Sequence, residues 1–285
     1  MAQTKNEVSN LGQVKSYLSN DKVKGRFNDV LGKKAPQFIA SIINIVGSTK
    51  QLESCDAQSV IASAMVAASL DLPIDPNLGF SALVPYNDNK TGIKYAQFQM
   101  MYKGFIQLAI RSGQYKKMNV AEVYEDELIE YNPITGELTF VSDFRETNQR
   151  RNGEKDKIVG YYAFFELNTG FRKELYMTKE DCINHAKEYS ASYKQDLKKG
   201  WSSSKWTTDF DAMAKKTVIK LLISKWGIMT VDMQKAIIDD QKVFDENENG
   251  SYKDNPEQDI PTEEVIDAFT VTEVSSEPIS EEPQA

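Results

Sequence analysis

The sequence predicts an α+β fold in which β-hairpins, and therefore antiparallel strands, alternate with amphipathic helices. Side chains alternate in character over residues 80–86 and 94–100, which is the period of a strand. The period becomes helical over residues 102–112, and a longer helical pattern returns over residues 209–226. With 285 residues, 40% of them hydrophobic, the chain can bury a substantial core in one or two domains.

The chain before residue 80 is predicted to be helical. Residues 1–24 are polar, and we expect them to be mobile, with a short helix around residues 14–18. Residues 36–46 form a helix with a proline in its first turn. Asp56 is a suitable N-cap for a helix over residues 57–70, which ends before two prolines because proline cannot continue a helix.

The segment 80–117 combines a hairpin with a helix. The first strand puts Phe80, Ala82, Val84 and Tyr86 on one face, and the return strand puts Lys94, Ala96, Phe98 and Met100 on one face and Tyr95, Gln97, Gln99 and Met101 on the other. Residues 87–92 are rich in Asn, Asp and Gly, which tolerate the backbone angles of a turn. Gly113 is a plausible end for the helix that follows.

The helix after the hairpin carries a row of polar side chains opposite its apolar stripe. The row consists of Lys103, Gln107, Arg111 and Gln114, and Lys116 and Lys117 follow it. Two cations and two amides suit a phosphate backbone, because cations supply charge and amides supply neutral hydrogen bonds. An ordinary solvated helix face explains the same row.

The second half of the chain continues with strands and then with helices. Strands are expected over residues 118–124, 128–131, 138–141, 157–167 and 171–177, and helices over 178–187, 209–226 and 231–238. Thr178 and Asp181 have the spacing of a helix cap and the third residue after it. Residues 189–208 interleave aromatic residues with lysines.

The net charge of −8 conceals an asymmetry along the chain. From Asp239 to the end there are 15 acidic residues against two lysines, a net charge of −13. The preceding 238 residues carry 32 basic and 27 acidic residues, a net charge of +5. A mildly basic body joined to a strongly acidic tail is typical of nucleic-acid binding proteins.

The acidic tail, residues 239–285, is rich in Glu, Asp, Pro and Ser and is expected to be disordered. Residues 261–269 stand out within it, because Val265, Ile266 and Phe269 would share one face of a helix. This segment is a candidate docking helix that folds on a protein partner; a chance apolar cluster is the alternative.

The sequence offers few groups for catalysis, and we expect no enzyme, cofactor or metal. One histidine gives little support for a catalytic triad, and the phosphate-binding loop of ATPases is absent. Cys182 and His185 are too few to close a zinc site, and Cys55 and Cys182 give no disulfide framework. No apolar run is long enough for a membrane span, and no signal peptide is evident, so we expect a cytosolic protein.

Binding to single-stranded nucleic acid finds more support. Single strands are held by cations that follow the backbone and by aromatic rings on which bases stack. The chain supplies Lys103, Arg111, Lys116 and Lys117 with Tyr86, Phe98 and Tyr102, and also Lys205, Lys215, Lys216 and Lys220 with Trp201 and Trp206. Core packing is the alternative role for Phe98, Tyr102 and Trp206.

Five segments resemble the RecT family of phage-encoded single-strand DNA annealing proteins. They are LGKKAPQFIASI, AASLDLPIDPNLGFSALVPY, QFQMMYKGFIQLAIRSGQYK, GYYAFFELNTGFRK and MAKKTVIKLLISKWGIM, which occur in the family's order within residues 30–238. The resemblance implies an ATP-independent protein that coats single-stranded DNA, anneals complementary strands and assembles into rings or helical filaments. It also implies an antiparallel sheet backed by helices, like that of the phage lambda Red beta and eukaryotic Rad annealing proteins.

The resemblance further implies the position of the DNA groove and the partners. The groove would be lined by segment 97–117, including Gln97 and Gln99, by the basic residues of 205–220, and by Arg172 and Lys173 between them. A phage exonuclease and the host single-strand binding protein are the implied protein partners. A metal-dependent nuclease and a passive coating protein remain the alternative functions.

Overall fold

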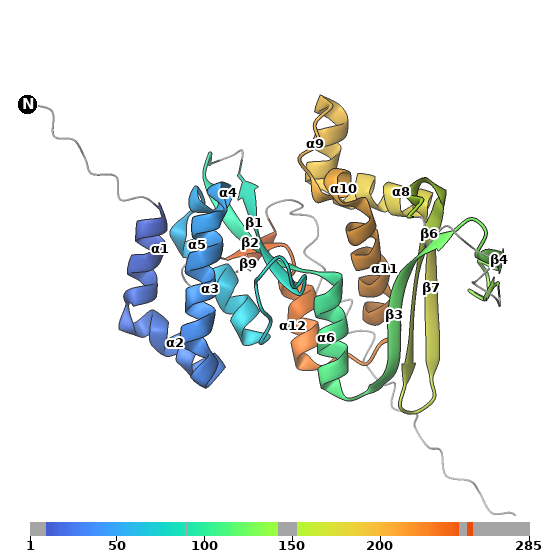
Figure 1. The fold of residues 1–285 in the computed structure, drawn as a ribbon, viewed down its shortest axis with the longest axis horizontal. Helices are drawn as coiled ribbons and strands as arrows, with labels where there is room; N and C mark the ends of the chain where they lie inside the picture. The colour runs from blue at the N-terminus through green and yellow to red at the C-terminus, as the bar shows by residue number, and fades with distance from the viewer. Residues whose placement is uncertain (1–9, 89–90, 142–152, 245–249, 253–285) are drawn as a thin grey trace, which may run out of the picture.

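The computed structural model describes residues 10–88, 91–141, 153–244 and 250–252. It shows helices combined with antiparallel β-structure (Figure 1). The helices are α1 (Asn10–Ser19), α2 (Asp21–Leu31), α3 (Ala35–Ser48), α4 (Lys50–Glu53), α5 (Ala57–Ser69), α6 (Tyr102–Ser112), α8 (Lys179–Tyr189), α9 (Ala191–Lys199), α10 (Lys205–Thr208), α11 (Phe210–Trp226) and α12 (Val231–Asp239). The strands are β1 (Ser81–Asn87), β2 (Lys94–Met100), β3 (Tyr115–Tyr124), β4 (Leu128–Tyr131), β5 (Leu138–Phe140), β6 (Ile158–Leu167), β7 (Arg172–Thr178), β8 (Lys242–Phe244) and β9 (Gly250–Tyr252).

The first helices form a layer beside the β1–β2 hairpin (Figure 1). Helix α1 packs against α5, and its Val14 and Leu18 are buried. Helix α2 is capped by Asn20, whose side-chain oxygen accepts a hydrogen bond from the Lys22 N–H. The expectation of a mobile segment is therefore wrong for residues 10–24, while residues 1–9 lie outside the described residues.

The predicted hairpin is confirmed, and both edges of β2 are occupied. One edge pairs with β1, with Leu83 opposite Phe98. On the other edge, the Ala96 N–H donates to Ser59 Oγ at 2.8 Å, and Ser63 Oγ donates to the Ala96 carbonyl at 2.9 Å. Side chains of α5 thus satisfy polar groups that an unpaired strand edge would leave open.

The predicted strands of the second half form a three-stranded antiparallel sheet in the order β3-β6-β7. Helices α8 and α11 pack on one face of it, where Tyr161 and Phe165 of β6 are fully buried (Figure 1). Tyr161 Oη donates to Asp211 of α11 at 2.7 Å. The capping box that begins α8, between Thr178 and Asp181, is present as predicted.

The chain after Ile238 re-enters the core. The Asp240 side chain is completely buried, and its Oδ1 accepts hydrogen bonds from the Met100 N–H of β2 and from Lys216 Nζ, both at 2.9 Å. Its Oδ2 accepts from Lys220 Nζ at 3.1 Å. This carboxylate therefore joins the hairpin to α11.

Strand β8 extends this C-terminal attachment. The Gln241 N–H donates to the Phe98 carbonyl at 2.9 Å, so residues 240–241 continue along the edge of β2 that α5 began to cover. Val243 and Phe244 are buried. The prediction of a disordered tail from residue 239 is wrong for residues 239–244 and 250–252; the rest of the tail, with its candidate docking helix, lies outside the described residues.

Lys216, which is buried, and Lys220, which is partly exposed, favour the ionised form of Asp240. Burial alone would raise the pKa of this carboxyl, but Lys216, Lys220 and the Met100 N–H outweigh that effect and hold the pKa below its usual value. Replacing one member of a buried ion pair leaves the other charge uncompensated.

No helix in the described part of the chain has the length and hydrophobicity needed to cross a lipid bilayer.

We predict that Asp240→Asn lowers the free energy of unfolding by about 3–5 kcal/mol, because it strands Lys216 in the interior. Chemical denaturation at pH 7 measures this. The matched control is Glu154→Gln, which removes the exposed pair with Lys157 and should cost less than about 1 kcal/mol.

The stability difference between wild type and Asp240→Asn should also depend on pH. Because the folded pKa of Asp240 is depressed, its stabilising contribution is complete above the unfolded value of about 3.9 and is lost as the pH falls through the lower folded value. The stability difference between wild type and Asp240→Asn should therefore shrink below about pH 4. Equal stabilities at pH 7 would contradict a structural role for Asp240.

Candidate nucleic-acid interface

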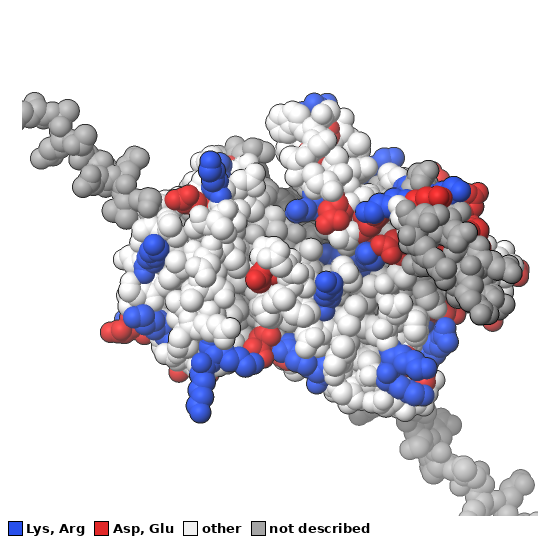
Figure 2. Space-filling view, in the orientation of Figure 1, with Lys and Arg blue, Asp and Glu red and all other residues white. Residues whose placement is uncertain are grey.

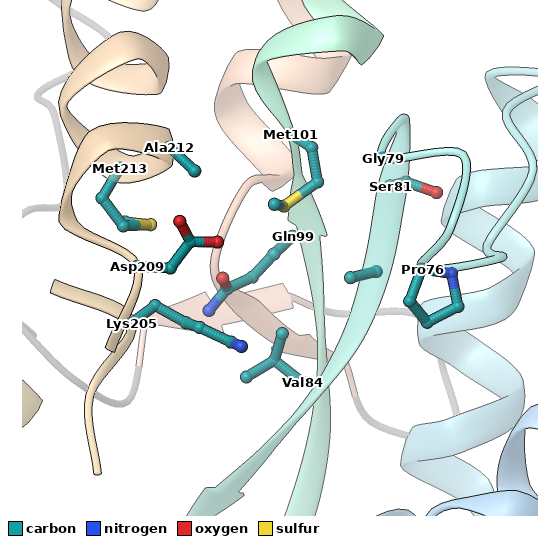
Figure 3. A pocket seen from close by; sticks show the side chains of 11 residues that line it. Pro76, Gly79, Ser81, Val84, Gln99, Met101, Lys205, Asp209, Ala212 and Met213 are labelled. Atoms are coloured by element: carbon teal, nitrogen blue, oxygen red, sulfur yellow. The ribbon is translucent and has the colours of Figure 1, made fainter. Parts of the chain in front are cut away.

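A cleft separates one face of the β1–β2 hairpin from α10 and the start of α11 (Figure 3). We call it the central cleft, and its lining residues are Pro76, Gly79, Ser81, Ala82, Val84, Gln99, Met101, Lys205, Asp209, Ala212 and Met213. Its volume of about 180 Å³ is below the ~300–1,000 Å³ of ordinary small-molecule sites. The cleft is thus better suited to part of an extended ligand than to an enclosed cofactor.

Two predicted binding residues meet at the central cleft from distant parts of the chain. Gln99 extends from β2, and Lys205 extends from α10 toward the hairpin (Figure 3). Lys103 is not a lining residue of the cleft but lies against Gly79, which is one: a Cβ placed on Gly79 would be 3.5 Å from Lys103 Cδ. Gly79 also has a φ of +69°, a left-handed conformation that favours glycine.

Four of the predicted binding residues are buried in the interior of the protein. Gln97, Phe98, Trp206 and Lys216 are all at most 6% exposed. Phe98 packs in the core, and Trp206 packs edge-on against Phe210 with ring centres 5.5 Å apart. Their assignment to the DNA surface is wrong for this conformation, because a base or phosphate cannot reach them.

Other predicted residues are engaged in contacts within the fold. Arg111 donates to the carbonyls of Leu70 and Asp71 just after α5, so it binds the carbonyls that this helix leaves open. Lys215 binds Glu122 at 2.6 Å and lies 5.2 Å from the ring centre of Tyr102.

These contacts break up the predicted rows of cations. Lys220 is held by Asp240. Gln107 and Tyr86 are half-buried, on α6 and near the end of β1. The row that begins with Lys103 is therefore not one continuous phosphate-binding stripe, since Arg111 supports α5 instead.

A second group of cations gathers where β3 begins and β7 leaves its turn (Figure 2). We call it the sheet-end patch; it consists of Lys116, Lys117, Arg172, Lys173, Lys225 and Trp226. Lys116 pairs with Glu166 at 2.5 Å, and Arg172 pairs with Glu174 at 3.3 Å. Five cations against two carboxylates leave this end of the molecule positively charged.

Two residues outside the predicted binding set complete these regions. Asp209 lines the central cleft, and Trp226 is 44% exposed in the sheet-end patch. The only signal for Trp226 was the aromatic residue beside a lysine at a predicted helix end.

In the described residues, no three His, Cys, Asp or Glu side chains gather as they would around a metal ion. Burial raises the pKa of the Cys182 thiol to about 12.

The family model described as "RecT family" matches residues 36–260. The chain is 46% identical over 229 residues to a protein of Bacillus subtilis (strain 168) named "Uncharacterized protein YqaK", covering 80% of this chain and 72% of that protein. It is 27% identical over 233 residues to "Protein RecT" of Escherichia coli (strain K12), covering 80% of each.

The family match extends past Ile238 and therefore includes Asp240 and β8, the part of the fold that the sequence analysis had assigned to the tail. A match over residues 36–260 spans most of the 285-residue chain, and the chain belongs to the RecT family.

Proposed function

We propose that this protein binds single-stranded DNA along the central cleft and anneals complementary strands during homologous recombination, without ATP. Membership of the RecT family supports single-strand annealing and DNA recombination. The observation that carries the proposal is the meeting of Gln99 and Lys205 at one cleft, from segments about a hundred residues apart, with Lys103 against Gly79 in the wall of that cleft.

The chemistry of these side chains fits a phosphate backbone. Lysine offers a strongly hydrated point charge and glutamine an uncharged donor, and neither reads base sequence when it contacts phosphate. Cations along the cleft reduce the repulsion between two polyanions that have to meet. A strand held by its backbone keeps its bases available for pairing with a second strand.

The proposal includes assembly and partners. We propose that the protein acts as a homo-oligomer, a ring or helical filament on DNA, with the fold of the Red beta annealing proteins. A phage exonuclease and the host single-strand binding protein are its proposed partners, and the bacterial cytoplasm its proposed location. The segment with Val265, Ile266 and Phe269 is the proposed partner-binding element.

One assay distinguishes annealing from the alternatives. Two complementary oligonucleotides, one with a fluorophore and one with a quencher, are mixed with the full-length protein. We expect faster quenching without ATP or divalent metal than in the protein-free reaction. Metal-dependent loss of the labelled strand would instead indicate a nuclease. Binding without faster quenching would indicate a passive coating protein.

The central cleft makes a prediction for salt dependence. If Lys103 and Lys205 each bind one phosphate, replacing either with alanine should make the negative slope of log affinity against log salt shallower by roughly 0.7 on single strands. Asp209→Asn is the matched variant, because Asp209 lines the same cleft and its side chain makes no cap bond to α11. The Asp209→Asn protein should bind single strands more tightly than wild type. Unchanged salt slopes for both lysine variants would rule out the central cleft as the DNA-binding site.

The chain beyond β9 makes a separate prediction. Residues 253–285 contain ten acidic residues against one lysine, a net charge of −9. Ending the chain after Tyr252 should leave DNA binding unchanged or strengthen it, since these charges compete with DNA.

Ending the chain after Ile238 should instead destabilise the fold, because it removes Asp240 and β8. Titration of labelled oligothymidine measures the affinity of each truncated protein, and chemical denaturation measures its stability. Weaker binding by the protein that ends at Tyr252 would contradict the proposed competition.

A further inference from the structure

Trp226 is an exposed aromatic residue close to two lysines. It is the last residue of α11 and is 44% exposed, whereas Trp206 is only 6% exposed. Lys173 Nζ lies 4.8 Å from the centre of the Trp226 ring, and Lys225 Nζ lies 5.5 Å from it. Both distances are within the ~6 Å range of cation–π contacts.

The backbone that carries Trp226 is held firmly. The Tyr115 hydroxyl donates to the Ile228 carbonyl at 3.0 Å, and the Tyr115 ring packs edge-on against Phe165 of β6. A Cβ on Gly227 would lie 2.5 Å from the Tyr115 hydroxyl, so this close approach requires glycine. An aromatic side chain on such a support is preorganised and loses little conformational freedom when it binds a ligand.

The two lysines beside Trp226 differ from Lys116 and Arg172 of the sheet-end patch. Lys116 and Arg172 are paired with carboxylates, but no carboxylate of the described residues lies within 4.0 Å of Lys173 Nζ or Lys225 Nζ. Their ammonium groups end flexible side chains and can move to a phosphate. An exposed cation–π contact is weaker than the stacking of a base on an aromatic ring, so a base can displace a lysine from Trp226.

Trp226 is also well separated from the central cleft. It follows Ala212, which lines the cleft, by fourteen residues of the same helix, a distance of about 21 Å at ~1.5 Å per residue. A nucleotide at the cleft therefore cannot also contact Trp226.

We propose that Trp226, Lys173 and Lys225 form a second contact site for single-stranded DNA, at the opposite end of α11 from the central cleft. An unpaired base stacks on the indole ring, and the two lysines bind the phosphates on either side of it. The inference rests on the proposed function, because it adds a second contact to the same ligand. Stacking requires an unstacked base, so this site favours single strands over annealed duplex.

The test compares Trp226→Ala, Trp226→Phe and Leu221→Ala in the full-length protein. Leu221 is the control, since it is a 38% exposed apolar residue of the same helix that lies outside both surfaces. The affinities for labelled oligothymidine and for a blunt duplex are measured at one salt concentration. We expect Trp226→Ala to weaken oligothymidine binding by about 5-fold or more and duplex binding by less than about 2-fold. Trp226→Phe should retain most of the affinity, and Leu221→Ala all of it.

Salt dependence gives a second readout that a purely structural role would not change. Trp226→Ala should leave the salt slope unaltered because indole is uncharged, while Lys173→Ala and Lys225→Ala should each lower it by roughly 0.7. A Trp226→Ala protein that binds oligothymidine like Leu221→Ala, or that loses single-strand and duplex affinity equally, overturns the second site. Those results leave the proposed function standing if wild type binds and anneals. A wild-type protein that binds no oligothymidine overturns both.

Discussion

The buried carboxylate of Asp240 is the interaction on which the arrangement of the other elements depends. It accepts hydrogen bonds from the backbone of β2 and from two lysines of α11, so one side chain connects the hairpin, the long helix and the C-terminal strand. Removing a carboxylate from water costs several kcal/mol, and three donors, two of them charged, are what make its burial tolerable. Since the central cleft lies between that hairpin and that helix, its shape depends on the same contact.

The same interaction decides which cations of α11 can meet DNA. The sequence places Lys215, Lys216 and Lys220 on this helix, and their number alone suggests a basic DNA-binding surface. Glu122 pairs with Lys215, and the single carboxylate of Asp240 pairs with both Lys216 and Lys220. The lysines of this region without a carboxylate partner among the described residues are Lys205, just before the helix, and Lys225, at its end. Lysines that look alike in the sequence of this region therefore differ in whether an internal carboxylate binds them.

Local patterns were sufficient for most elements of the fold. Alternation predicted the hairpin, and the spacing of Thr178 and Asp181 predicted the start of α8, because both signals lie within a few consecutive residues. Helix α1 was underestimated, since its two buried residues, Val14 and Leu18, give little periodicity by themselves. Strand β8 was missed because three residues carry no periodic signal and acidic residues surround them.

The candidate site was less predictable than the fold for a different physical reason. Composition tells which residues are cations, but the availability of a cation depends on carboxylates that are remote in sequence. Lys216 and Lys205 look alike in the sequence. Lys216 is buried and paired with Asp240, however, whereas Lys205 lines the central cleft.

A partner 24 residues away in the chain can be located only by the packing of β2, α11 and β8 together. For a protein that must hold a polyanion, the relevant quantity is thus the set of cations without an internal counter-charge. That set is fixed by tertiary structure, and the two lysines near Trp226, which have no carboxylate partner among the described residues, illustrate it as clearly as Lys205 does.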